Sequence, residues 1–429
     1  MESLGSAQSS LGLRAAPMSI SVGLAVLSLA PLLLWTSASS APIAASPSAD
    51  QRTGVMSGSS MITIGVAADL GGSTDWIGWP QANAVQLAIS QTNGAGGVEI
   101  DGVPHTLTLV TADSACDATQ AVTAANSLVN AGVVAVVGHT CSPASYTAQP
   151  IYNAAGIPMV LASPTSPGLT KQGYTTTFRV VSKDDTTGNL MATYFRHWLG
   201  LDTAAIIEWD FYWGSSSPDA FQDTFTSQGG TITSRRTVTS TADYTATLSA
   251  IQPENPDAIF WSDINGNSAG FLNRTTHNLG MSNVIMGWDA MGGDLDAYAV
   301  AAGPAAEGSY AITSMTTDQM PGYDDFNAAY QATGFPYYGA EAQAWGAFAY
   351  DAAQIIIAAI GRADSVGLTA IRDGIANTTD YVGVVGTYEG FDTNGDVIPQ
   401  WAWLKRYHDG QWMILRPSRV YLPLVLNDF

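Results

Sequence analysis

We predict an α/β fold of two lobes, each built on a doubly wound parallel sheet, from three observations. Apolar segments of strand length alternate with helical segments along most of the chain, which is the pattern of consecutive βαβ units. The alternation restarts near residue 183, so the second half repeats the organisation of the first. The 429 residues are enough for two or three domains, and 46% hydrophobic residues indicate a folded protein.

The first lobe opens with the apolar segment MITIGVAA, residues 61–68. Its expected strands are residues 61–68, 107–112, 133–137 and 157–161, and its expected helices are residues 80–93, a helix ending near residue 130, and residues 145–153. Asp117 and Gln120 have the spacing of a capping box at the start of the second helix. We expect residues 69–79 to form a loop that carries Trp76 and Trp79.

The second lobe repeats the rhythm. Its expected strands are residues 204–209, 231–238, 257–261 and 284–287, and its expected helices are residues 188–199, 217–228, 244–251 and 269–279. Long helices are expected next, at 323–333 and 340–360. A hairpin with a turn at Asp409-Gly410 is expected after them. The acidic run Asp392 to Asp396 resembles a calcium loop, but Val397 stands where that loop needs glycine, which favours an Asn-Gly turn.

The net charge and the missing catalytic motifs exclude several classes of function. The formal net charge of −21 makes nucleic acid and anionic membranes poor partners. The five histidines are scattered without metal-ligand spacing, and the sequence has no G-x-S-x-G, H-E-x-x-H or phosphate-loop motif. A nucleophile built from His139 and Cys141 is the one enzymatic alternative. We therefore expect a binding protein with no cofactor and no metal.

The N-terminus has the pattern of an export signal. Arg14 precedes an apolar run at residues 20–35, and small residues at 37–45 supply cleavage positions. We assign residues 1–45 to a signal peptide and 46–60 to a Ser/Gly-rich linker, with a membrane anchor as the alternative. The mature protein is then exported, either periplasmic or at the cell surface. In that setting Cys116 and Cys141 most simply pair, with two buried thiols as the alternative.

Two turns follow apolar strands and run into segments that can open helices. In residues 140–143, Ser142 occupies an N-cap position and Pro143 the first helical position. Residues 163–167 repeat the arrangement with Ser166 and Pro167. Because helix starts offer unpaired N–H groups and lie at the ligand-binding edge of an open α/β sheet, the two turns are a candidate seat for a carboxylate.

Aromatic residues gather at the expected strand ends of both lobes, as ligand clefts require, although each alone is more often a core residue. They are Trp76, Trp79, Trp209, Phe211, Tyr212, Trp213 and Trp288. Asp289, next to Trp288, is an acid that could receive an ammonium group, or it could simply cap a helix.

The segment CDATQAVTAANSLVNAGVVAVVGHTCSPAS, followed by GIPMVLASPTSPGLTKQGYTTTFRV, resembles the periplasmic leucine/isoleucine/valine-binding proteins, the type I substrate-binding components of ABC importers. The resemblance runs from about residue 62 to 415 and is dense between 113 and 179. It implies two α/β lobes joined by crossover hinges. The first lobe would be residues 61–182 and 309–390, and the second 183–308 and 391–429.

The resemblance also implies a Cys116–Cys141 disulfide and a set of ligand contacts. Ser142, Ser163 and Thr165, with Pro164 in the same turn, would hold the α-carboxylate and α-ammonium, Ser163 mainly through its backbone. Asp289 stands where the family has a glutamate for the ammonium. Trp213 and Trp76 fall at aromatic ligand positions, and Asn265 replaces a tyrosine.

The expected function is capture of an apolar α-amino acid, branched-chain or aromatic, between the lobes, without catalysis. The expected partners are the amino acid and an ABC transporter permease, and we expect a monomer. A binder of an amide or urea in the same fold is the first alternative, and a receptor sensing domain is the second. The tail at 418–429 extends past the resemblance, either as a last strand or as a surface-attachment segment.

Overall fold

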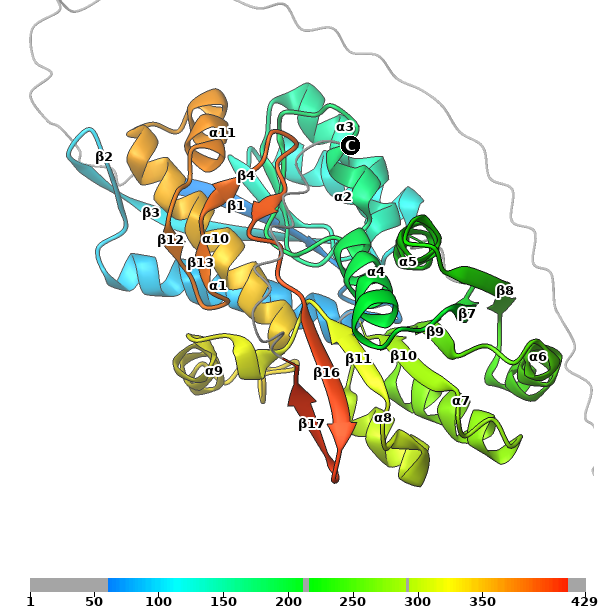
Figure 1. Cartoon of the computed structure of the whole chain (residues 1–429). Coiled ribbons are helices and arrows are strands. Elements are labelled where there is room, and N and C mark those ends of the chain that lie inside the picture. Colours follow the sequence, from blue (N-terminus) through cyan, green and yellow to red (C-terminus); the bar gives the residue numbers. More distant parts are fainter. Residues whose placement is uncertain (1–60, 211–215, 291–292, 416–429) are drawn as a thin grey trace, which may run out of the picture. The chain divides into compact units, whose positions relative to one another are not determined.

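A computed structural model describes residues 61–210, 216–290 and 293–415. Within these residues the chain forms two mostly parallel sheets with helices packed against them (Figure 1). The first sheet has the order β2-β3-β1-β4-β5-β6. Its strands are β1 Met61–Ala68, β2 Val98–Ile100, β3 Val103–Asp113, β4 Ala135–Gly138, β5 Met159–Leu161 and β6 Thr177–Arg179.

The second sheet has the order β17-β16-β11-β10-β9-β7-β8. Its strands are β7 Thr203–Trp209, β8 Thr231–Val238, β9 Ala258–Ser262, β10 Ile285–Asp289, β11 Tyr310–Thr313, β16 Trp403–His408 and β17 Gln411–Ile414. The hairpin β16–β17 adds two antiparallel strands to a parallel sheet, around the expected turn at Asp409-Gly410. The predicted fold class is confirmed.

The helices alternate with the strands as the sequence pattern predicts. They are α1 Asp75–Gly94, α2 Ala118–Asn130, α3 Ser142–Ala155, α4 Asp184–Thr193, α5 Ser216–Ser227, α6 Tyr244–Ile251, α7 Gly266–Asn278, α8 Leu295–Ala302, α9 Tyr323–Ala332, α10 Gln343–Ala363 and α11 Leu368–Ala376. Asp117 caps α2, where its side chain accepts hydrogen bonds from the amides of Thr119 and Gln120.

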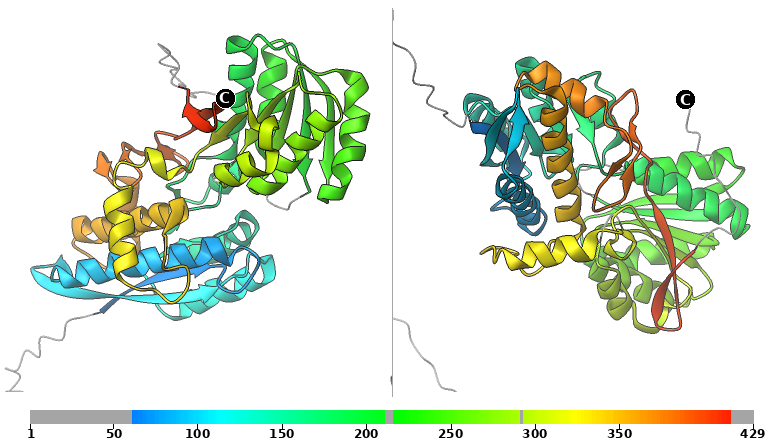
Figure 2. Two further views of the ribbon diagram at one scale, coloured as in Figure 1. Left: turned by 90° about the horizontal axis from the view of Figure 1, so that it is seen from below. Right: turned by 90° about the vertical axis from the view of Figure 1, so that its left-hand side faces the viewer.

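Each sheet has a buried core on both faces. Successive side chains of a strand point to opposite sides of the sheet, and both sets are covered by helices. In β1, Ile62, Ile64 and Val66 join the core formed with α1 and α10, whereas Ala67 joins the core beneath α2 and α3. Figure 2 shows α1 and α10 side by side. The long apolar helix α10 meets the length and composition of a membrane span, but 78% of its most apolar window is buried in this core.

Three crossovers join the sheets: β6 to α4, β11 to α9, and the segment 399–402 before β16. Two short strands, β14 Gly390–Phe391 and β15 Val397–Ile398, pair beside the third. The expected segment boundaries need correction at two points. β11 pairs with β10 and β16 of the second sheet, although we assigned 309–390 to the first lobe. Asp396 bridges to Arg179 of the first sheet, although we assigned 391–429 to the second.

The expected loop at 69–79 was also wrong in part, because α1 begins at Asp75 and carries Trp76 and Trp79. The Asp69 carboxylate accepts hydrogen bonds from the amides of Gly72 and Thr74 and folds the preceding turn. A Cβ atom at Gly78 would lie 1.9 Å from the Asp69 carbonyl oxygen, so glycine is needed for the helix to pack this closely. These contacts are local, but they follow no helical spacing, so helical periodicity does not report them.

Candidate functional site

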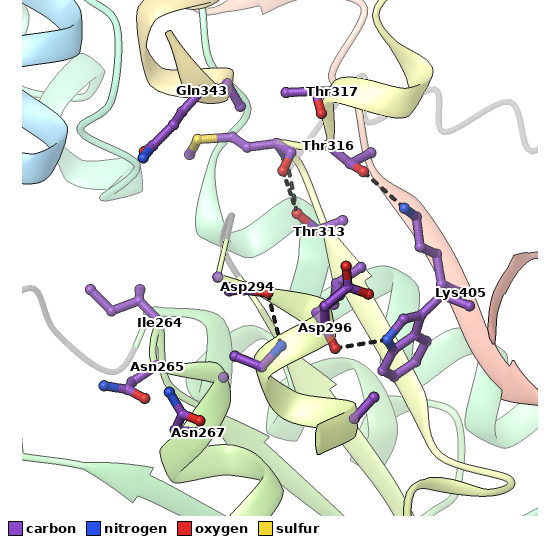
Figure 3. Close-up of a pocket in the computed structure, with 18 of the residues that line it drawn as sticks. Ile264, Asn265, Asn267, Asp294, Asp296, Thr313, Thr316, Thr317, Gln343 and Lys405 are labelled. Carbon is purple, nitrogen blue, oxygen red and sulfur yellow. Dashed lines mark hydrogen bonds between the residues drawn. The ribbon is translucent and has the colours of Figure 1, made fainter. Parts of the chain in front are cut away.

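A pocket of about 1340 Å³ is lined by residues from both halves of the described chain (Figure 3). One wall comes from the start of α1 and the start of α10. The other comes from the loops that follow β9, β10 and β11 and from the β16–β17 hairpin. The carboxyl ends of parallel strands therefore contribute most of the second wall, where ligands of open α/β sheets are expected.

Two tryptophans form an aromatic corner of this pocket. The rings of Trp76 and Trp345 meet edge to face, with centroids 6.3 Å apart and an interplanar angle of 79°. Trp76 is a predicted site residue, but Trp345 is not. Its place in an Ala-rich helix indicates a core residue, and only the packing of α10 against α1 brings it to the pocket.

The pocket is strongly acidic. The carboxylates in its lining belong to Asp263, Asp294, Asp296, Asp318 and Glu341. Burial raises the pKa of Asp263 to about 6. Lys405 supplies a cation, but its ammonium donates to Thr316 at 2.8 Å and to Asp318 at 3.0 Å, so its charge is paired within the protein.

Asn265 lines the same pocket, and its side chain caps α7 by accepting a hydrogen bond from the Ser268 amide at 3.0 Å. Of the predicted site residues, Trp76 and Asn265 line this pocket. Trp213 lies outside the described residues, as does the tail at 418–429.

Ser142 and Ser163 lie at the carboxyl ends of the paired strands β4 and β5. Ser142 is the first residue of α3, not its N-cap as expected, because Cys141 keeps an extended backbone and its carbonyl accepts from the Ser145 amide. The Ser142 hydroxyl accepts from the Ser166 amide at 3.4 Å, so the two turns are in contact. The Ser163 hydroxyl donates to the Thr140 carbonyl at 2.7 Å, which engages its side chain.

The second turn does not open an α-helix as expected. Pro167–Thr170 is a single 3₁₀ turn, and the Ser166 side chain does not cap it. The carbonyl of Pro164 accepts from Arg179 at 3.4 Å, and the carbonyl of Thr165 accepts from the Asp184 amide at 3.1 Å. These carbonyls are held by the protein, while the turn keeps its place at the strand end.

Asp289 ends β10 and is fully buried. Its carboxylate accepts from the Thr187 hydroxyl at 3.0 Å. It does not cap α8, since Asp294 takes that position. Asp289, Ser142, Ser163, Pro164 and Thr165 are absent from the lining of the pocket in Figure 3.

Cys116 and Cys141 form a disulfide, with Cα atoms 5.2 Å apart. It ties the start of α3 to the connection between β3 and α2, and the Thr74 hydroxyl lies 2.9 Å from the Cys116 sulfur. Cys141 therefore has no free thiol, and the alternative of a Cys141–His139 nucleophile is excluded. His139 instead packs in the core, where its Nε2 lies 3.1 Å from the Tyr152 hydroxyl and burial lowers its pKa to about 3.

A possible metal-ligand group, Glu307, His408 and Asp409, lies at the surface near the β16–β17 turn. The His408 ring pairs with Glu307 at 2.7 Å and lies 3.5 Å from Asp409, and the Glu307 hydrogen bond raises its pKa. These contacts explain the cluster as surface ion pairing.

Comparisons with known proteins agree with this architecture. The family model described as "Periplasmic binding protein" matches residues 61–409. The Leucine-specific-binding protein of Salmonella typhimurium is 29% identical over 261 residues, covering 61% of this chain and 69% of the relative. The Leu/Ile/Val-binding protein BraC3 of Rhizobium johnstonii is 28% identical over 319 residues, covering 73% and 84%.

Solved structures give the same picture. The leucine binding protein LivK of Thermotoga maritima superposes with a TM-score of 0.68 at 25% identity, covering 83% of this chain and 98% of that one. The branched-chain amino acid transporter substrate binding protein LivJ of Streptococcus pneumoniae, in complex with isoleucine, gives 0.67 at 25% identity, covering 83% and 100%.

Proposed function

The chain belongs to the periplasmic binding protein family, and we propose that it captures an apolar α-amino acid for an ABC importer. The family consists of substrate-binding proteins of transporters and not of enzymes, and it implies an exported, periplasmic location. The leucine-binding relatives and the isoleucine-bound neighbour support an amino acid ligand.

The observation that carries the proposal is the contact between the two strand-end turns. Ser142 and Ser166 meet at 3.4 Å beside the carboxyl ends of adjacent strands. In the proposed complex the α-carboxylate takes the Ser142 hydroxyl and the Thr165 amide, because the Thr165 hydroxyl is engaged by the Asp184 carboxylate. The Ser163 hydroxyl is engaged by Thr140, so Ser163 contributes its backbone. The Asp289 carboxylate accepts a charge-assisted hydrogen bond from the α-ammonium. Pro164 lies in the same turn as Ser163 and Thr165.

The aromatic corner supports a ligand with a large apolar side chain. Trp76 and Trp345 offer flat apolar surface, and Asn265 lines the same pocket. The two rings favour an aromatic amino acid as much as a branched-chain one. Because the lining is acidic and repels anions, the proposed ligand has no anionic group other than its α-carboxylate.

A thermal-shift screen of the purified protein against the twenty amino acids, with acetamide and urea, tests the proposal. Binding to the native state stabilises it by roughly 2.7 kcal/mol at a hundredfold excess over Kd. We expect shifts with a subset of apolar amino acids. Shifts with acetamide or urea alone would transfer the function to the alternative binder in the same fold.

We further propose how the N-terminus is processed and in which oligomeric state the protein acts. Residues 1–45 act as a signal peptide that is removed, 46–60 serve as a linker, and the mature protein delivers its ligand to the permease as a monomer. Mass spectrometry of the mature protein locates the cleavage site, and size-exclusion chromatography with light scattering determines the oligomeric state. A dimer, or an uncleaved N-terminus, would contradict these assignments.

A further inference from the structure

We infer that Arg179 is a positioning residue that couples the ligand-binding turn at 163–166 to the crossover segments between the lobes. This inference rests on the proposed function, because it assigns Arg179 to the turn that would hold the amino acid. Arg179 ends β6, the edge strand of the first sheet, and its side chain is fully buried.

One side of the guanidinium faces the third crossover region. Its Nε and Nη2 donate to the same oxygen of Asp396, at 2.8 and 2.6 Å. Asp396 is also buried, and the Arg179 amide donates to the Gly395 carbonyl at 2.8 Å. The turn that resembled a calcium loop is therefore held to the first sheet by a buried ion pair.

The other side of the guanidinium faces the ligand-binding turn. Its Nη1 donates to the carbonyls of Ser166 at 2.8 Å and Pro164 at 3.4 Å. Its Nη2 also donates to the Thr170 hydroxyl at 2.9 Å, just beyond the turn. A guanidinium is planar and its donors are fixed in one plane, so the carbonyls and the Asp396 carboxylate cannot shift relative to each other without breaking hydrogen bonds.

The first crossover joins the same network. The Lys183 ammonium lies 3.3 Å from the second oxygen of Asp396, and the Lys183 amide donates to the Gln400 side chain at 2.9 Å. The next residue, Asp184, donates its amide to the Thr165 carbonyl at 3.1 Å. Two crossovers and the turn are thus connected through Arg179 and its neighbours. A rearrangement of either crossover would therefore change the hydrogen bonds that hold the turn.

The inference is tested by hydrogen–deuterium exchange of the purified protein and of the variants Arg179→Lys and Asp396→Asn. Lysine keeps the charge but cannot bridge both sides, and the Asp396 carboxylate is bound by Arg179, Thr170 and Lys183 rather than by residues 163–166. We expect two amides to exchange at least tenfold faster in both variants: that of Ser166, which donates to the Ser142 hydroxyl, and that of Asp184, which donates to the Thr165 carbonyl. The β1 amides should keep their wild-type rates. Wild-type rates at the turn, or equal acceleration throughout the protein, would overturn the inference.

The second readout is affinity. Calorimetric titration with the amino acid found by the screen should give at least tenfold weaker binding for Arg179→Lys. Arg235→Lys is the matched control, since Arg235 on β8 also donates through Nε and Nη2 to one carboxylate, that of Glu208 at 2.8 and 2.7 Å, and it has no hydrogen bond to the turn. Equal loss of affinity in both variants would contradict a special role for Arg179. If the wild type binds no α-amino acid, the proposed function fails, and the exchange rates alone decide on Arg179.

Discussion

At the scale of single residues, burial without a charged partner determines the protonation state of His139. Its imidazole is fully buried, and only the Tyr152 hydroxyl lies within hydrogen-bond distance among the described residues. Desolvation lowers its pKa from 6.5 to about 3. The unfolded chain therefore binds a proton below pH 6.5 that the native protein does not bind until about pH 3, and stability contributed by neutral His139 falls across that window.

We predict that His139→Gln flattens this dependence. Between pH 7.5 and 5 the wild type should lose about 2 kcal/mol of unfolding free energy more than the variant, which corresponds to about 1.5 pH units at about 1.36 kcal/mol each. Urea unfolding at the two pH values measures the difference. His105→Gln, at a partly exposed position on β3, is the control and should keep the wild-type slope. Identical slopes for wild type and His139→Gln would show that His139 contributes nothing.

Asp289 carries the second prediction at this scale. Asp289→Asn keeps the shape of the side chain but removes the charge proposed to receive the ammonium, so affinity for an α-amino acid should fall tenfold or more. Calorimetric titration measures it. Asp257→Asn is the matched control, because Asp257 also accepts from a threonine hydroxyl, that of Thr203 at 2.8 Å, but lies at the amino end of β9, the opposite edge of the sheet. Unchanged affinity in Asp289→Asn would remove this residue from the site.

At the scale of elements, the disulfide joins two connections of the first sheet. It closes a loop with a sequence separation of 25, and such a cross-link stabilises a fold by roughly 3 kcal/mol, mainly through the unfolded chain. We predict that the double variant Cys116→Ser with Cys141→Ser loses about that much in urea unfolding. Wild type unfolded in reductant should match the variant. A variant as stable as the oxidised wild type would contradict this assignment.

The strands and helices could be predicted from the sequence wherever a long periodic segment ends in a local signal. The Asp117 cap fixes the start of α2, and the apolar run at β1 gives its full length. The expected elements did not include the short helix α8 or the four-residue strand β11. α1 begins earlier than expected because the Asp69 turn packs closely against the helix at Gly78, a local contact that helical periodicity does not report.

The residues of the candidate site also divide into those that the sequence predicts and those that it does not. The two turns could be located from strand ends and helix-start residues, and their mutual contact through Ser142 follows from the pairing of β4 and β5. Trp345 and Arg179 could not be located, since one belongs to a helix with core periodicity and the other to a short edge strand. Their roles depend on contacts with α1 and with Asp396, hundreds of residues apart in the sequence.

At the scale of the whole molecule, the described part of the chain crosses three times between the two large sheets, and the proposed ligand contacts come from both. Hinge closure of such lobes removes water from the ligand, which strengthens its few charged hydrogen bonds. The order of the strands and the exact crossovers depend on long-range pairing, as the place of β11 in the second sheet illustrates.

The most direct test of the central claim is calorimetric titration of the purified protein with leucine and with phenylalanine. Capture between the lobes predicts saturable binding of at least one of them with one site per chain, and its loss in Ser142→Ala combined with Asp289→Asn. Absence of binding by every α-amino acid, in protein shown by mass spectrometry to be free of ligand, would contradict the account.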